Sequence, residues 1–203
     1  MTSIRATTAG LVSLVLLLGG CSGMRIVDSD VTAFSTVAPA TVALPVRYRF
    51  ERLPSQQAQP AQSAALEALA QPVLAQAGLV RDDAAPAYSV QMDLRVFRDP
   101  QAPWDDPRYV NGFVIAHPVP GRFGMQMYYP SLTMNFDYPY YRRDISVLVR
   151  RLSDAQVVFE SRARHDGRWN DDDAVLPAML QAAMQGFPAP QAGPRRVVIE
   201  IPR

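Results

Sequence analysis

The stretch YSVQMDLRVFR, residues 88–98, decides the class of fold that the sequence predicts. Apolar side chains stand at every second position, and polar side chains fill most of the positions between them. Because successive side chains of a strand point to opposite faces of a sheet, this period of two predicts a strand with one buried face. The apolar positions are Tyr88, Val90, Met92, Leu94 and Val96.

The same alternation recurs along the chain and favours an antiparallel sheet. Strands are predicted at residues 45–51, 144–152, 156–164 and 196–201. Ser153-Asp154-Ala155 is suited to a tight hairpin between the second and the third of these. Extended structure is also predicted at 125–136, with Pro130 at an edge or bulge, and a short strand within 110–116.

Two other stretches have helical spacing. The first is predicted to begin after Ser63, kink at Pro72 and end at Gly78. The second is predicted to begin at Asp171-Asp172-Asp173 and to end at Gly186. Their apolar positions are Leu66, Leu69, Val73 and Leu74 in the first, and Val175, Leu176, Met179, Leu180 and Ala183 in the second.

These elements predict an α+β fold. Short turns between strands favour antiparallel pairing, so we expect a two-layer sandwich in which two helices cover one face of a mostly antiparallel sheet of about five to six strands. Residues 54–63 are predicted to form a loop. Five prolines between residues 100 and 120 predict a long loop or insertion over 100–124, within a single domain of residues 42–203.

The composition excludes several classes of function. Twenty basic residues against nineteen acidic ones give a net charge of +1, which argues against a nucleic-acid partner. All twenty basic residues are arginine, so a P-loop, a Schiff-base enzyme and a Ser–Lys hydrolase are excluded. One cysteine and two histidines, His117 and His165, leave no multi-Cys or three-His metal site, and we expect neither a metal nor a cofactor.

The first twenty residues have the pattern of a secretory signal peptide. Met1–Arg5 carries one positive charge, and the twelve residues Ala9–Gly20 are almost all apolar or glycine. As a helix this stretch would measure about 18 Å, too short to cross the roughly 30 Å of hydrocarbon in a bilayer. A removable signal is therefore favoured over a membrane-spanning helix.

The end of that signal resembles the lipobox of bacterial lipoproteins. Leu18-Gly19-Gly20-Cys21 places the only cysteine of the chain directly after two small residues. The resemblance implies cleavage between Gly20 and Cys21, and a diacylglycerol and a further acyl chain on Cys21. Residues 21–41 would then be the lipidated cysteine and a tether, and a short strand could form near residues 26–34. Ser22 rather than Asp after the cysteine implies the outer membrane facing the periplasm, although the choice between inner and outer membrane depends on the host.

The order of segments behind the lipobox resembles the DUF4136 family of bacterial lipoproteins, a domain of unknown function. The matching segments are Tyr48-Arg49-Phe50, residues 88–98 followed by Trp104-Asp105-Asp106-Pro107, the hairpin 142–164 and the helix 174–187. They would cover most of residues 25–190. The resemblance brings no catalytic motif, so it implies no site residue other than Cys21.

Two polar clusters invite a chemical interpretation. Asn170 and the three aspartates after it could hold a calcium ion, but an N-terminal helix cap is favoured because no EF-hand spacing follows. His165-Asp166 could serve a hydrolase as base and orienting acid, but no G-x-S-x-G motif is present. A solvated loop beside Gly167 is favoured for this pair.

An aromatic and arginine-rich stretch is the candidate binding surface. Either these aromatic rings pack under the 100–124 loop, or some are exposed and provide contact area for a glycan or protein. Arginines 142, 143, 150 and 151 could bind an anionic lipid or polysaccharide, or could be a solvated strand face paired with Asp144 and Asp154. The candidate residues are Trp104, Tyr128, Tyr129, Tyr138, Tyr140, Tyr141 and Arg142.

The sequence therefore predicts a lipid-anchored envelope protein, held on the membrane through Cys21, that binds or assists another component and is not an enzyme. The expected partner is an envelope protein, met through the aromatic stretch or an open sheet edge. The alternatives are a glycan- or lipid-binding module that uses the Tyr, Trp and Arg surface, and a hydrolase that uses His165.

Overall fold

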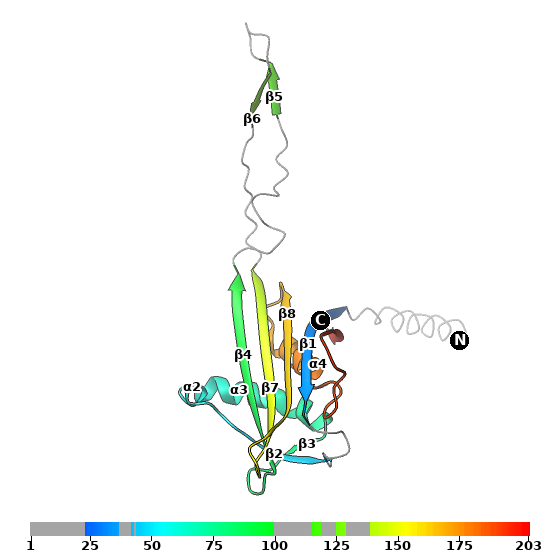
Figure 1. The fold of residues 1–203 in the computed structure, drawn as a ribbon. Helices are drawn as coiled ribbons and strands as arrows, with labels where there is room; N and C mark the ends of the chain where they lie inside the picture. The colour runs from blue at the N-terminus through cyan, green and yellow to red at the C-terminus, as the bar shows by residue number, and fades with distance from the viewer. Residues whose placement is uncertain (1–22, 37–41, 43, 100–114, 119–124, 129–138) are drawn as a thin grey trace, which may run out of the picture.

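The computed structural model describes residues 23–36, 42, 44–99, 115–118, 125–128 and 139–203. Seven of its strands form one open sheet, and helices pack on one face of that sheet (Figure 1). In chain order these strands are β1 (Met24–Ser35), β2 (Val46–Phe50), β3 (Leu79–Arg81), β4 (Tyr88–Asp99), β7 (Tyr140–Arg151), β8 (Val157–Gly167) and β9 (Arg195–Pro202).

The order of strands in space is β3-β2-β4-β7-β8-β1-β9. From β4 to β9 every neighbouring pair is antiparallel, whereas β2 lies parallel to both β3 and β4. Parallel neighbours need a crossover connection, and the helical segment between β2 and β3 provides it. β5 (Ile115–Pro118) and β6 (Met125–Tyr128) form a separate antiparallel pair in the segment between β4 and β7.

Three helices lie in the described chain: α2 (Pro54–Gln57), α3 (Pro60–Gln76) and α4 (Asp172–Met184). The prediction of a loop over 54–63 was wrong, because α2 and the first turn of α3 occupy it. Both helices begin with proline, which is tolerated there since the first turn has N–H groups without helical partners. Ser63 lies inside α3 and does not cap it; its hydroxyl donates to the Gln56 carbonyl at 2.9 Å.

The core lies between the sheet and the helices α3 and α4. In β7, Ile145, Val147 and Val149 are fully buried against them, as the alternation predicts. α4 contributes the larger apolar surface, with Val175, Met179 and Leu180 inaccessible to solvent. The turn between β7 and β8 is the predicted hairpin, with Ala155 at a positive φ of 57°.

The structure confirms the α+β class and the sheet with helices packed on it, with seven strands in place of five to six. β3 escaped the prediction because three residues show no alternation. The other difference concerns residues 21–41, expected to be mainly a tether. The short strand expected there near 26–34 is a twelve-residue interior strand, β1, which lies between β8 and β9 and buries Val27 and Val31.

Candidate functional site

A cluster of buried charged side chains lies where β1, β7 and β8 meet the first turn of α4. Arg143 is wholly buried. Its Nε donates to the Asp172 carboxylate at 2.7 Å, and its Nη2 donates to the Trp169 carbonyl at 2.7 Å. Arg25, 9% exposed, donates to Asp171 at 2.7 Å and lies 5.0 Å over the Trp169 ring. The hydrogen bond from Arg25 lowers the pKa of Asp171 below its ordinary value.

These contacts fasten the start of α4 to the sheet. Asp171 is the N-cap residue of α4, and its carboxylate accepts from the Ala174 N–H at 3.3 Å. Asp172 follows in the first turn, where a negative charge is favoured by the helix dipole. The helix-cap interpretation of the acidic run thus holds, and no group of metal-ligating residues occurs in the described chain.

His165 belongs to the same cluster, and its sequence prediction is wrong. It was expected in a solvated loop, but β8 continues to Gly167 and His165 is only 4% exposed. Its Nδ1 lies 2.7 Å from the Asp28 carbonyl, and its Nε2 has no hydrogen-bond partner within the described residues. Since a general base needs a nucleophile within hydrogen-bond reach, the described residues do not assemble the His–Ser pair that a serine hydrolase requires.

Asp166, the other half of the predicted pair, points away from this cluster and is exposed. It accepts a hydrogen bond from the Tyr140 hydroxyl. Burial and this hydrogen bond raise the pKa of Tyr140 to about 12.

The predicted aromatic surface is only partly within the described chain. Trp104, Tyr129 and Tyr138 lie outside the described residues, as does the side chain of Tyr128. Tyr140 is 4% exposed and so contributes no contact surface. Tyr141 is half-buried, and the guanidinium carbon of Arg143 lies 5.2 Å from the centre of its ring. Arg142 is exposed.

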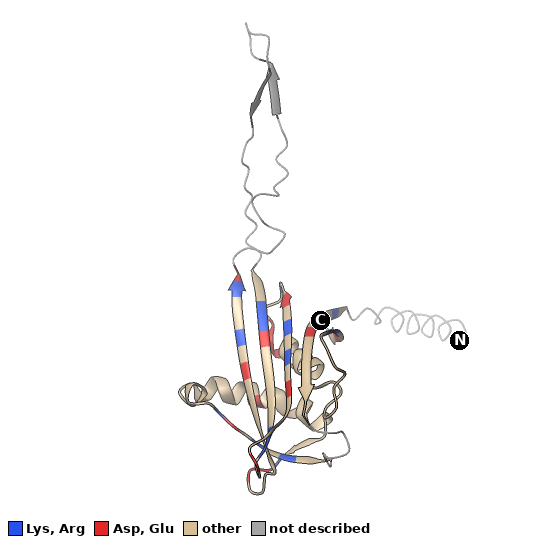
Figure 2. Ribbon diagram, in the orientation of Figure 1, with Lys and Arg blue, Asp and Glu red and all other residues tan. Residues whose placement is uncertain are grey.

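The arginines of the β7–β8 hairpin divide between the two faces of the sheet. On the face away from the helices, Arg150 pairs with Glu51 at 3.3 Å, and Arg162 and Arg164 pair with Asp144 at 3.4 and 3.0 Å. Figure 2 shows the acidic and basic positions close together along β4, β7 and β8. This is the solvated face expected from the sequence. For Arg143 the expectation of a solvated position is wrong, because this side chain faces the helices and is fully buried.

A free sheet edge begins where β2 leaves β4. β2 pairs with β4 only as far as Val90, and the Glu51 N–H donates to the Val90 carbonyl at 2.9 Å. The Gln56 amide then caps the Met92 carbonyl on the same side. Since alternate residues of a strand direct their N–H and C=O to the same side, the backbones of Leu94, Val96 and Arg98 point outward. No strand of the described chain pairs with them there.

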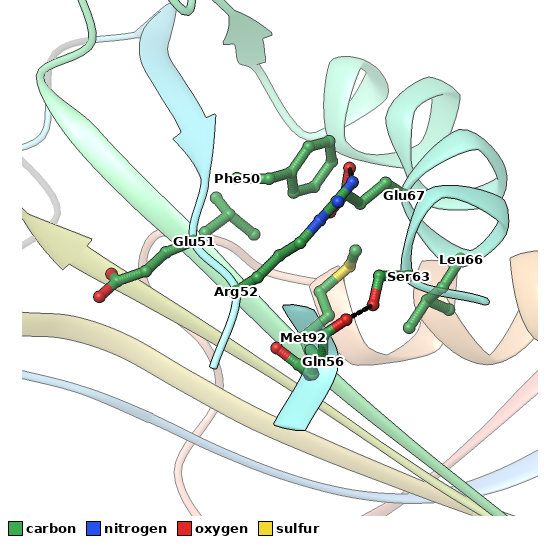
Figure 3. A pocket seen from close by; sticks show the side chains of 9 residues that line it. Phe50, Glu51, Arg52, Gln56, Ser63, Leu66, Glu67 and Met92 are labelled. Carbon is green, nitrogen blue, oxygen red and sulfur yellow. Dashed lines mark hydrogen bonds and ion pairs between the residues drawn. The ribbon is translucent and has the colours of Figure 1, made fainter. Parts of the chain in front are cut away.

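Two hollows adjoin this free edge. Figure 3 shows the inner one, of about 20 Å³, where the Arg52 guanidinium meets the Glu67 carboxylate at 2.6 and 2.8 Å. It has room for about one water molecule. The outer one is a shallow groove of about 210 Å³, which we call the amide groove because glutamine and serine side chains line most of it. Its residues are Ser55, Gln56, Gln59, Gln62, Ser63, Leu66, Asp93 and Leu94.

The free edge and the amide groove together can hold an extended chain. The edge offers backbone donors and acceptors in a row, and glutamine amides can both donate and accept hydrogen bonds. Val96 and Phe97 flank the edge on opposite faces and are 41% and 56% exposed.

The family model described as "Domain of unknown function (DUF4136)" matches residues 27–189. The chain belongs to the DUF4136 family. The match runs from β1 to just beyond α4, so the DUF4136 domain includes the free edge of β4, the amide groove and most of the buried cluster. Among the residues described, no helix has both the length and the hydropathy to span a bilayer.

The remaining comparisons concern solved structures, because no curated protein matches the chain. The chain is similar to a PDZ domain protein from Parabacteroides distasonis, with a TM-score of 0.48 and 14% identity over 94% of this chain and 42% of that one. It therefore spans less than half the length of that protein. It is also similar to the PelC dodecamer from Paraburkholderia phytofirmans, with a TM-score of 0.42 and 11% identity over 79% of this chain and 99% of the other.

Proposed function

We propose that this protein is a lipoprotein of the cell envelope that binds a partner and catalyses no reaction. The sequence supports the anchor through the lipobox that ends at Cys21. Each buried CH₂ contributes roughly 0.8 kcal/mol, so several acyl chains on one residue make release from the membrane negligible. Ser22 after the cysteine favours the outer membrane, with the folded domain in the periplasm.

The free edge of β4 is the observation that carries the binding role. Exposed strand edges are ordinarily protected, because they pair readily with another chain. Here the edge is flanked by exposed Val96 and Phe97 and continues directly from the amide groove. We infer that a partner protein adds an extended segment to this edge, in the place that β2 would occupy if it were longer.

Site-specific photo-crosslinking in cells tests this binding role. A photoreactive phenylalanine analogue replaces Phe97 at the free edge, and in a matched control it replaces Phe34, which is 61% exposed on β1. We expect a discrete protein adduct from position 97 and none from position 34. Equal adducts at both positions, or adducts at neither, would contradict a binding site at this edge.

The anchor is tested separately by fractionation of cells that produce the Cys21→Ser variant. The wild-type chain should sediment with membranes and resist extraction by salt, while the variant should be released with soluble proteins. A variant that sediments as firmly as the wild type would rule out anchoring through Cys21.

A further inference from the structure

The distance between the anchor and the folded domain is short enough to fix which end of the domain lies at the membrane. β1 begins at Met24, and only Ser22 and Gly23 separate it from Cys21. Two residues span at most about 7 Å, so Gly23 lies within that distance of the Cys21 Cα. Gly23 itself belongs to the folded domain, because its carbonyl accepts a hydrogen bond from the Arg203 N–H at 2.9 Å.

The side chains at this end of the sheet are those suited to a lipid headgroup layer. Met24 and Ile26 are 51% and 60% exposed, and Trp169 is 44% exposed. Trp169 lies at the same end, since its ring is 5.0 Å from the Arg25 guanidinium carbon and 6.0 Å from that of Arg203. Tryptophan is favoured at membrane interfaces, where its apolar ring and its N–H meet apolar and wet surroundings together.

The depth of these side chains agrees with an interfacial position. Ile26 is two residues along β1 from Met24, a rise of about 7 Å for an antiparallel strand. Groups that lie in the interface are buried roughly 5–10 Å into the boundary between headgroups and acyl chains. Met24 and Ile26 point to the face of the sheet away from the helices, and Arg25 and its contact Trp169 lie on the other side, so apolar side chains flank both sides of the anchored end.

We propose that Met24, Ile26 and Trp169 form a membrane-contact surface that inserts into the headgroup layer beside the acyl chains of Cys21. This inference rests on the proposed lipid anchor and adds an orientation to it. The anchored end of the sheet faces the bilayer, and β1 carries the rest of the domain away from it. Phe34, ten residues along β1 from Met24, would then lie about 34 Å from that end, well outside the membrane.

Tryptophan fluorescence of the acylated protein tests the surface. The chain has two tryptophans, so a Trp104→Phe change leaves Trp169 as the single reporter. The protein is reconstituted into phosphatidylcholine vesicles with and without brominated acyl chains, which quench tryptophan only on contact. We expect the emission of Trp169 to move to shorter wavelength in vesicles and to be quenched by the brominated lipid.

A matched control carries Phe34→Trp, Trp104→Phe and Trp169→Phe, with a circular dichroism spectrum to verify folding. This reporter stands at a position that is 61% exposed, against 44% for Trp169, but it is remote from the anchored end, and we expect no quenching. Acylated, vesicle-bound protein whose Trp169 is not quenched, or is quenched no more than the reporter at position 34, would overturn the membrane-contact surface and leave the anchor intact. Protein that carries no acyl chain by mass and does not bind vesicles would overturn the anchor, and the inference with it.

Discussion

At the scale of single residues, Arg142 and Arg143 are neighbours with opposite roles. Arg143 is fully buried with hydrogen bonds to Asp172 and to the Trp169 carbonyl, and Arg142 is exposed on the other face of β7. Arg143→Ala should lower the free energy of unfolding by about 3 kcal/mol, since it leaves a cavity and removes the hydrogen bonds to Asp172 and to the Trp169 carbonyl. Arg142→Ala should change it by no more than about 0.5 kcal/mol.

Urea unfolding of both variants, followed by far-UV circular dichroism, measures this difference. Similar values for the two would mean that the Arg143 contacts contribute nothing to stability. The period of two places these residues on opposite faces of the strand, but it does not predict the burial of Arg143, because an arginine on a buried face breaks the rule that charged side chains stay in water.

Tyr48 should make the protein less stable in alkali. Its ring is fully buried, and burial raises the pKa of its hydroxyl to about 12, against about 10 in an unfolded chain. Below about pH 10 the Tyr48 hydroxyl is protonated in both states, so its contribution to the free energy of unfolding does not change with pH. Between pH 10 and 12 the folded chain retains a proton that the unfolded chain has lost, so the free energy of unfolding falls as the pH rises.

Tyr48→Phe should reduce this fall, as measured by urea unfolding at pH 8 and pH 11. Part of the fall with pH should remain in the variant, because the pKa of Tyr140 is also raised to about 12. At pH 8 the variant should be no less stable than the wild type, because the Tyr48 hydroxyl has no hydrogen-bond partner in the described chain. An unchanged dependence on pH would show that the Tyr48 hydroxyl is not the titrating group.

At the scale of elements, the free edge of β4 predicts different effects of proline at adjacent positions. The Val96 N–H points outward at the edge, while the Phe97 N–H points toward β7. Val96→Pro should therefore cost little stability, because proline is tolerated where the N–H faces solvent. Phe97→Pro removes a hydrogen bond within the sheet and should cost about 1–3 kcal/mol.

The same pair of variants relates the edge to binding. Val96→Pro should abolish the partner adduct formed from position 97 while the domain stays folded, since proline cannot donate to an added strand. Thermal unfolding gives the stability comparison, and the photo-crosslink gives the binding comparison. A Val96→Pro variant that still forms the adduct would place the partner elsewhere.

Elements with strong periodicity were predictable from the sequence, and elements set by tertiary contacts were not. The strand at 88–98 and the helix after Asp171 follow from spacing and capping that act locally. β3 owes its three residues to pairing with β2 across the crossover helix α3, and a prediction by spacing has no access to that contact. α2 begins at Pro54 in a segment where proline suggested a loop, because proline is compatible with a first helical turn.

The candidate site shows the same division. The helix cap at Asp171 was predictable from the acidic run, but its ion pair with Arg25 joins residues far apart in the sequence. His165 lies in a strand and not in the loop that Gly167 suggests, because β8 pairs with β7 as far as Gly167. The free edge of β4 depends on where β2 stops, which no local pattern of β4 reveals.

At the scale of the whole molecule, the topology brings ends of five strands together at the side of the sheet where the proposed anchor joins the domain. β1 begins, and β8 and β9 end, at the end of the sheet nearest Cys21, and β4 ends and β7 begins there as well. The amide groove lies farther from that end of the sheet, beside Asp93 and Leu94 of β4. The proposed anchor at one end and the free strand edge along one side would together hold a partner close to a membrane, as the proposed function requires.

The central claim is that Cys21 carries the lipid, and the mass of the intact protein purified from membranes tests it most directly. The mature chain should begin at Cys21, retain 183 of the 203 residues, and exceed its peptide mass by a diacylglyceryl group and one acyl chain. Globomycin, which blocks the lipoprotein signal peptidase, should leave the first twenty residues attached to a diacylglyceryl-modified chain. A mature chain of unmodified peptide mass, or one whose processing is indifferent to globomycin, would contradict the account.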